Sequence, residues 1–188
     1  MKSPLIPLLK SGQTVFSNDD LRLYWGVDGA DYLKTKIYRL VREKLLLPLA
    51  SGVYSTVPDY DPLELANKLV TPSYVSLRTV LAQAGAVFQY DSAIHSVAQV
   101  TREQTVGSRT YSYRKVKDAA FLASDGILFG KNVTIATPER ALLDLLYLEK
   151  DASIDNLAVF DQARCRALLP LYANAQLTRR LNALFNAQ

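Results

Sequence analysis

Residues 30–57 read ADYLKTKIYRLVREKLLLPLASGVYSTV, and the hydrophobic period changes in the middle of this stretch. From 30 to 44 the apolar residues recur every three or four positions, which is typical of the buried face of an α-helix. Beyond it, 45–49 and 53–57 favour two short strands, and the three-residue turn Ala50-Ser51-Gly52 between them predicts a β-hairpin. Pro48 indicates that the first strand lies at a sheet edge. The apolar positions of the helix are Leu33, Ile37, Leu40, Val41 and Leu45.

The same helix concentrates positive charge. Five cations and one acid between residues 34 and 44 give this segment a charge of +4, equal to the net charge of the whole chain. Thr35, Arg39 and Arg42 fall on the face opposite the apolar one. Such a helix fits the major groove of DNA, where arginine can contact a guanine edge or a phosphate. We therefore predict that it binds DNA. Its charge is also compatible with a solvated helix in a small bundle, which is the structural alternative.

The segments before the helix complete a recognisable order of elements. Residues 4–11 favour a short helix, 14–16 have strand character, and Ser17 with Asp20 forms a capping-box pattern for a helix that ends at Gly26. Helix, turn, helix and hairpin in this order predict a winged helix-turn-helix domain over residues 1–58. Its predicted DNA contacts are Tyr32, Lys34, Thr35, Lys36, Tyr38, Arg39 and Arg42 of the helix and Ser51 and Tyr54 of the hairpin.

The rest of the chain, residues 59–188, predicts a second, α+β domain. Asp61 and Pro62 start one helix, and a second helix is expected from Thr71-Pro72 to Gly85. Five strand candidates, the first at 86–90, lie between residues 86 and 136 and predict an antiparallel sheet. Thr137 then starts a helix, and leucine-rich helices follow to the C-terminus.

A second basic stripe falls within this strand region. Residues 109–115 (RTYSYRK) alternate so that every second side chain shares one sheet face. Cations interleaved with aromatics resemble a platform for single-stranded nucleic acid, although an ordinary exposed sheet face has the same composition. The residues of this second candidate surface are Arg109, Tyr111, Tyr113 and Lys115.

Composition and motifs argue against an enzyme. One cysteine and one histidine exclude an internal disulfide and a Cys/His zinc site, and we expect Cys165 to be a buried thiol rather than a nucleophile paired with His95. Phosphate-binding glycine loops and the hydrolase elbow motif are absent, so we expect no metal, no cofactor and no catalytic residue. A nuclease built on the strand region stays as an alternative. The sequence has no long apolar run, and we expect a cytoplasmic protein without membrane contact.

Four stretches together resemble a known family. They are YRLVREKLLLPLASGVY at 38–54, DPLELANKL at 61–69, TPSYVSLRTVLAQAG at 71–85 and TPERALLDLLYL at 137–148. Their order and spacing resemble the AbiEi-type antitoxins of abortive-infection (type IV) toxin–antitoxin systems, over about residues 15–150.

The resemblance implies an N-terminal winged helix that binds inverted repeats in its own promoter and represses it. It also implies a C-terminal domain that counteracts a nucleotidyltransferase-like toxin, directly or only functionally. Family members usually carry arginine or lysine in the hairpin turn; here the turn is uncharged, so we expect the helix to do most of the binding. The alternative is a winged-helix regulator whose C-terminal domain binds an effector or another protein unrelated to a toxin.

Overall fold

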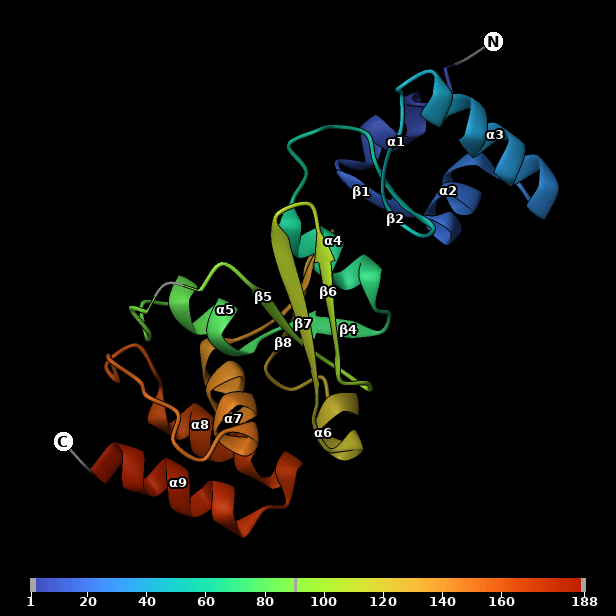
Figure 1. Ribbon diagram of the computed structural model, residues 1–188. Helices are drawn as coiled ribbons and strands as arrows, with labels where there is room; N and C mark the ends of the chain where they lie inside the picture. Colours follow the sequence, from blue (N-terminus) through green and yellow to red (C-terminus); the bar gives the residue numbers. More distant parts are fainter. Residues whose placement is uncertain (1–2, 90, 187–188) are drawn as a thin grey trace. The chain divides into compact units, whose positions relative to one another are not determined.

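The computed structural model describes residues 3–89 and 91–186. The chain is an α+β protein that divides into two compact units, Met1–Thr71 and Pro72–Gln188. Figure 1 follows the order of the elements along the chain. Within the described residues, every helix is too short or too polar to cross a membrane.

The first unit combines four helices and a small antiparallel sheet, counted within residues 3–71. The strand order is β1-β3-β2, so β2, which contains Pro48, is an edge strand as predicted. Ala50 pairs with Val53, so the hairpin turn is the two residues Ser51 and Gly52, one fewer than predicted. The elements are α1 (Ile6–Ser11), β1 (Val15–Ser17), α2 (Asn18–Trp25), α3 (Ala30–Arg42), β2 (Leu47–Ala50), β3 (Val53–Ser55) and α4 (Pro62–Leu69).

Local capping chemistry sets the helix boundaries of this unit. The Ser17 side chain accepts a hydrogen bond from the Asp20 backbone N–H, and the Asp20 carboxylate accepts one from the Ser17 N–H, which confirms the predicted capping box. Gly26 ends α2 at a φ of 60°, a conformation that glycine adopts readily. Asp61 caps α4, and Pro62 occupies its first turn, where the missing N–H is not needed.

A single apolar core holds α1, α2, α3 and the sheet together. Three of the five predicted apolar positions of α3 are buried, whereas Leu45 is 39% exposed and its neighbour Leu46 is fully buried instead. Phe16 of β1 packs edge-to-face against Tyr24 of α2, with ring centroids 5.9 Å apart. The buried core residues are Leu8, Phe16, Leu21, Val27, Leu33, Ile37, Leu40 and Leu46.

Helix α4 belongs to the first unit, and the division between the units follows Thr71 rather than residue 58. The buried Glu64 carboxylate accepts hydrogen bonds from the backbone at Thr14 and Val15, and Lys68 forms an ion pair with Asp20 at 2.7 Å. These contacts join α4 to β1 and α2. The Pro58–Pro62 segment that predicted a boundary is therefore a loop inside the unit.

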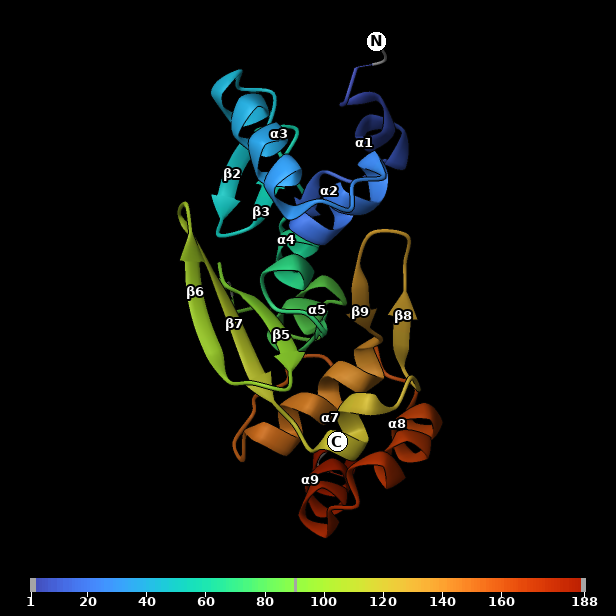
Figure 2. The ribbon, with the colours of Figure 1, turned by 90° about the vertical axis from the view of Figure 1, so that its right-hand side faces the viewer.

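The second unit contains a six-stranded sheet of order β6-β7-β5-β4-β9-β8. The sheet is mixed rather than antiparallel as predicted, because β5 pairs with β7 and β4 with β9 in parallel. Helices α8 and α9 both pack against α7 (Figures 1 and 2). The elements are β4 (Ser73–Val75), α5 (Leu77–Gln83), β5 (Ile94–Ala98), β6 (Arg102–Val106), β7 (Arg109–Lys115), α6 (Asp118–Leu122), β8 (Ile127–Phe129), β9 (Thr134–Ala136), α7 (Pro138–Leu148), α8 (Gln162–Leu168), a 3₁₀ turn (Leu169–Tyr172) and α9 (Ala175–Asn186).

Three predictions for this region are wrong in detail. The helix expected from Thr71 begins only at Leu77, because residues 73–75 pair with β5 and β9 to form β4. Residues 86–89 form no strand, and the Ala86 carbonyl instead accepts the backbone N–H groups of Asp155 and Asn156; residue 90 lies outside the described residues. The short helix α6 lies where only strands were expected.

A buried polar network is centred on α7. Arg140 and Asp144, one helical turn apart, are both fully buried, and their side chains approach to 3.4 Å. The Asp144 carboxylate also accepts hydrogen bonds from the hydroxyls of Tyr172 (2.6 Å), Ser76 (2.8 Å) and Tyr74 (3.1 Å). Arg140 donates to the carbonyls of Asp125 and Ala120, so polar protein groups surround both side chains. Burial, which outweighs the charge of Arg140 and the three hydroxyl hydrogen bonds, raises the pKa of Asp144 above its ordinary value.

Candidate nucleic-acid interface

Helix α3 has a core face and an exposed basic face. Its buried residues are Leu33, Ile37 and Leu40. On the opposite side Thr35, Arg39 and Arg42 are exposed, as the period of the sequence predicts. The core therefore anchors the helix along its length while these side chains face solvent.

The exposed face keeps its cations available to a ligand. Arg39 approaches Glu43 at 3.9 Å in an exposed pair of the kind that contributes little to stability. The Arg42 side chain makes no hydrogen bond or ion pair within residues 3–89 and 91–186. The Thr35 hydroxyl donates to the Asp31 carbonyl at 2.9 Å, so its oxygen remains free to accept but its proton is committed to the helix.

Lys36 lies at the edge of this face, one helical turn before Arg39, and its side chain reaches α2. Its ammonium is 4.4 Å from the Trp25 ring centroid and 6.0 Å from that of Tyr32, which is itself 62% exposed. Burial, and then the charge of Arg39, lower the pKa of Lys36 below its ordinary value. Lys36 therefore makes a cation–π contact with Trp25 of α2. Its contact with DNA stays a prediction.

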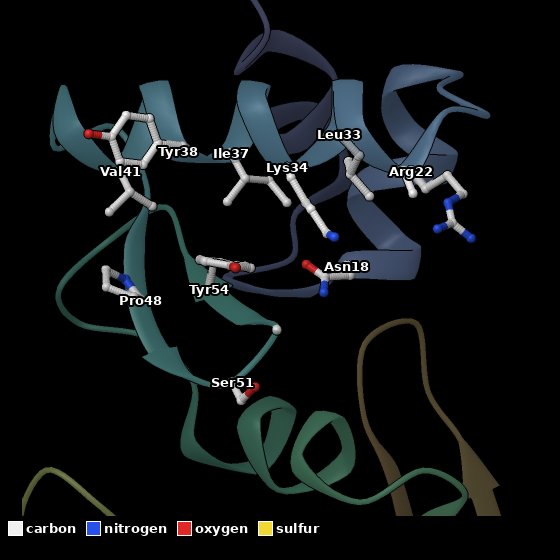
Figure 3. A pocket seen from close by; sticks show the side chains of 12 residues that line it. Asn18, Arg22, Leu33, Lys34, Ile37, Tyr38, Val41, Pro48, Ser51 and Tyr54 are labelled. Atoms are coloured by element: carbon white, nitrogen blue, oxygen red, sulfur yellow. The ribbon is translucent and has the colours of Figure 1, made fainter.

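A groove of about 550 Å³ separates α3 from the β2–β3 hairpin (Figure 3). Lys34 and Tyr38 border it from α3, and Ser51 and Tyr54 border it from the hairpin, so the structure brings four of the predicted contacts together. Its lining includes two cations and no acid. The full lining is Asn18, Arg22, Ala30, Leu33, Lys34, Ile37, Tyr38, Val41, Pro48, Ser51, Gly52 and Tyr54.

The hairpin turn is fixed to the start of α2. The Asn18 backbone N–H donates to the Gly52 carbonyl at 2.9 Å. Gly52 has a φ of 73°, and a Cβ at this position would lie 2.9 Å from the Asn18 side-chain nitrogen. The positive φ therefore favours glycine here, whereas the Asn18 amide, at the end of an exposed side chain, could move away from a Cβ.

The predicted contacts omit the two other polar side chains of the groove, Asn18 and Arg22. They are four positions apart on α2 and both exposed, so the helical period could have placed them on one face. Their position beside the hairpin depends on the Asn18–Gly52 contact between residues distant in sequence, which no local pattern encodes.

The second candidate surface is not an exposed platform. Tyr111 and Tyr113 are fully buried, and only Arg109 and Lys115 at the strand ends are exposed. Both rings lie on the face of β7 that is packed into the unit, whereas Ser112 and Arg114 on the opposite face are only half-buried. The buried ring faces cannot stack on nucleic-acid bases, and Lys115 instead lies 3.5 Å from Asp118.

The single cysteine and the single histidine, Cys165 and His95, do not form a pair in the structure. Cys165 is fully buried, and burial followed by the charges of Glu139 and Asp161 raises the pKa of its thiol to about 12. His95 instead contacts Asp91 at 2.6 Å. Across residues 3–89 and 91–186, no three His, Cys, Asp or Glu side chains are grouped so that they could hold a metal ion.

Comparisons with models of known protein families and with curated proteins find no match for this chain. The resemblance to AbiEi-type antitoxins therefore rests on the sequence stretches alone.

Proposed function

We propose that the protein is a DNA-binding transcriptional autorepressor and the antitoxin of a type IV toxin–antitoxin system. In this proposal residues 1–58 form a winged helix-turn-helix, with α3 as the recognition helix and the β2–β3 hairpin as the wing. Residues 59–71 include α4, which is fixed to β1 by the hydrogen bonds that Glu64 accepts from Thr14 and Val15. The protein acts by binding and carries out no covalent chemistry.

The observation that carries the DNA-binding proposal is the exposure of Arg39 and Arg42 on the side of α3 opposite its buried face. A helix anchored in this way can enter the major groove without exposing its core, and each guanidinium can then contact a guanine edge or a phosphate. The neighbouring hairpin adds a second element at the side of the same helix.

The antitoxin part is supported by the sequence resemblance, and we assign it to the second unit. Under this proposal the partners are the inverted repeats of the protein's own promoter and a nucleotidyltransferase-like toxin, opposed directly or only functionally.

DNA binding is tested with a gel-shift assay on the promoter upstream of the gene. The variant Arg39→Ala/Arg42→Ala should lose specific binding while keeping the wild-type circular dichroism spectrum. A matched control, Arg164→Ala/Arg166→Ala, removes two exposed arginines from α8 and should bind normally. Unchanged promoter affinity of the first double variant would refute the assigned role of α3.

The antitoxin proposal is tested by co-expression with a nucleotidyltransferase-like toxin encoded next to the gene. Wild-type protein should restore growth, and Arg39→Ala/Arg42→Ala should still restore it, because the antitoxin activity is assigned to the second unit. Continued growth arrest with soluble wild-type protein present would contradict the antitoxin assignment and favour a regulator unrelated to a toxin.

A further inference from the structure

We propose that the groove between α3 and the β2–β3 hairpin holds one sugar-phosphate strand of duplex DNA, with Arg22 and Lys34 as its phosphate ligands. This inference rests on the proposed function and adds a part of the interface, on α2, that the sequence did not indicate. It also separates two tasks within the first unit. Arg39 and Arg42 face the bases, and the groove residues fix the position of the backbone.

The shape of the groove suits this occupant. One wall is the side of α3 and the other is the hairpin, and the groove of about 550 Å³ lies between them (Figure 3). In duplex DNA, the major groove and the adjacent minor groove are separated by one backbone strand. If α3 enters the major groove and the hairpin approaches the minor groove, the DNA backbone strand between these grooves has to pass between α3 and the hairpin. The groove is the space that the fold leaves for it.

The charges of the groove match a phosphate. Arg22 and Lys34 come from different helices, and Figure 3 shows them together with Asn18 at one end of the groove. The lining contains no carboxylate to oppose an anion. The Asn18 amide adds a neutral donor beside the two cations. Arginine and lysine are the side chains that most often hold DNA phosphates.

Both cations are free to change partner. The Lys34 side chain makes no hydrogen bond or ion pair in the part of the chain that the structure describes. Arg22 contacts Asp19 at 3.6 Å, but the Asp19 side chain is 89% exposed, so the pair is weak. A phosphate can therefore replace Asp19 as the partner of Arg22 with little loss of interaction energy. Asp19 is then a competitor for the arginine, and its removal should strengthen DNA binding.

The other end of the groove is apolar and suits deoxyribose. Ile37, Val41 and Pro48 line it, and the Tyr54 ring lies between the hairpin and α3 (Figure 3). Sugar carbons can pack against these side chains while the phosphates remain at the cationic end. Low-polarity surroundings also strengthen the attraction between a phosphate and the nearby cations.

The experiment measures the affinity of the full chain for promoter DNA and for unrelated duplex DNA over a range of salt concentrations. Arg22→Ala and Lys34→Ala should each weaken binding to both DNAs about tenfold at 0.1 M salt and reduce the log–log salt slope by about one. Asp19→Asn should strengthen binding to both. The charge-matched controls Arg164→Ala and Asp59→Asn, neither of which lines the groove, should leave affinity and slope unchanged.

A modified DNA identifies the strand that occupies the groove. Replacing single promoter phosphates with neutral methylphosphonates should weaken wild-type binding at one or two positions between the major and minor grooves. The same replacements should have no further effect in Arg22→Ala/Lys34→Ala, because the phosphate has already lost its ligands. Additive losses would show that the two cations act elsewhere.

The outcomes separate this inference from the proposed function. If wild-type protein binds promoter DNA but Arg22→Ala and Lys34→Ala keep its affinity and salt slope, the groove assignment is overturned and the role of α3 stands. If wild-type protein binds neither DNA, both proposals fail. Equal circular dichroism spectra of wild type and variants confirm that the differences arise at the surface.

Discussion

Glu64 accepts two hydrogen bonds from Thr14, one from its backbone N–H at 2.7 Å and one from its hydroxyl at 2.8 Å, although 50 positions separate the two residues. The same carboxylate oxygen also accepts the Val15 N–H at 2.9 Å. Glu64 is only 3% exposed, so these groups replace the water that its charge would otherwise bind. The contact fixes α4 to the start of the small sheet.

We expect Glu64→Ala to destabilise the first unit by about 3 kcal/mol or more, because it leaves buried donors at Thr14 and Val15 without an acceptor. Glu64→Gln should cost less, since it keeps one acceptor oxygen. Chemical denaturation monitored by Trp25 fluorescence measures both. The control Glu103→Ala, at an exposed position of β6, should change the free energy of unfolding by less than about 0.5 kcal/mol. Equal stabilities of Glu64→Ala and wild type would contradict this account of α4.

The extent of the first unit can be tested with fragments. A chain of residues 1–71 should fold and unfold cooperatively, whereas 1–58 should not, because it lacks both Glu64 and Lys68. Thermal unfolding followed by circular dichroism distinguishes the two. If both fragments melt at the same temperature, α4 does not belong to the folding unit.

Asp20 gives the first unit a dependence on acid pH. Burial alone would raise its pKa, but hydrogen bonds from Lys68 and Ser17 together lower it below the ordinary value of 3.8. The folded state therefore holds its proton less tightly than the unfolded chain. The stabilisation from Asp20 is complete above the unfolded pKa and is lost as the pH falls through the lower folded pKa.

Asp20→Asn should consequently be less stable than wild type at pH 6, and the difference should shrink between about pH 5 and pH 2. Urea denaturation at several pH values measures it. Asp19→Asn, which alters the exposed neighbouring acid, should show a much smaller change with pH. A difference between Asp20→Asn and wild type that stays constant with pH would exclude this linkage.

Lys44 ends α3 in the left-handed region, with a φ of 58°. Its N–H donates to the Val41 carbonyl and the Leu45 N–H donates to the Leu40 carbonyl, which is the Schellman arrangement usually built with glycine. Lys44→Gly should therefore stabilise the protein by about 1 kcal/mol. Lys44→Ala removes the same charge without relieving the backbone and should bring no such gain. The denaturation midpoints of the two variants distinguish these explanations. If both variants are more stable than wild type, the loss of the positive charge is the cause rather than the relief of the backbone.

Asp144 should be among the residues whose removal most destabilises the second unit. Asp144→Ala leaves the buried Arg140 without its carboxylate and removes the acceptor of three hydroxyls, so we expect a loss of about 3–5 kcal/mol. Glu149→Ala breaks the more exposed ion pair with Arg78 and should cost about 1 kcal/mol or less. Equal losses in the two variants, measured by denaturation, would contradict a central role for the network.

The sequence by itself determined the features that arise from neighbouring residues. The Ser17–Asp20 capping box, the Asp61 cap, the basic face of α3 and the hairpin after it all follow from spacings of a few residues, because helix period, caps and turns are local.

Only the tertiary structure decided the remainder, because it depends on contacts between distant residues. Residues 73–75 form a strand because β5 and β9 pair with them, and Tyr111 and Tyr113 are buried because their face of β7 is the one packed into the unit. Glu64 placed α4 in the first unit through hydrogen bonds about 50 positions back along the chain. The groove beside α3 arises in the same way. Arg22 lines it together with Lys34 of α3 because α2 is tied to the hairpin turn, a contact between residues distant in sequence that no local pattern encodes.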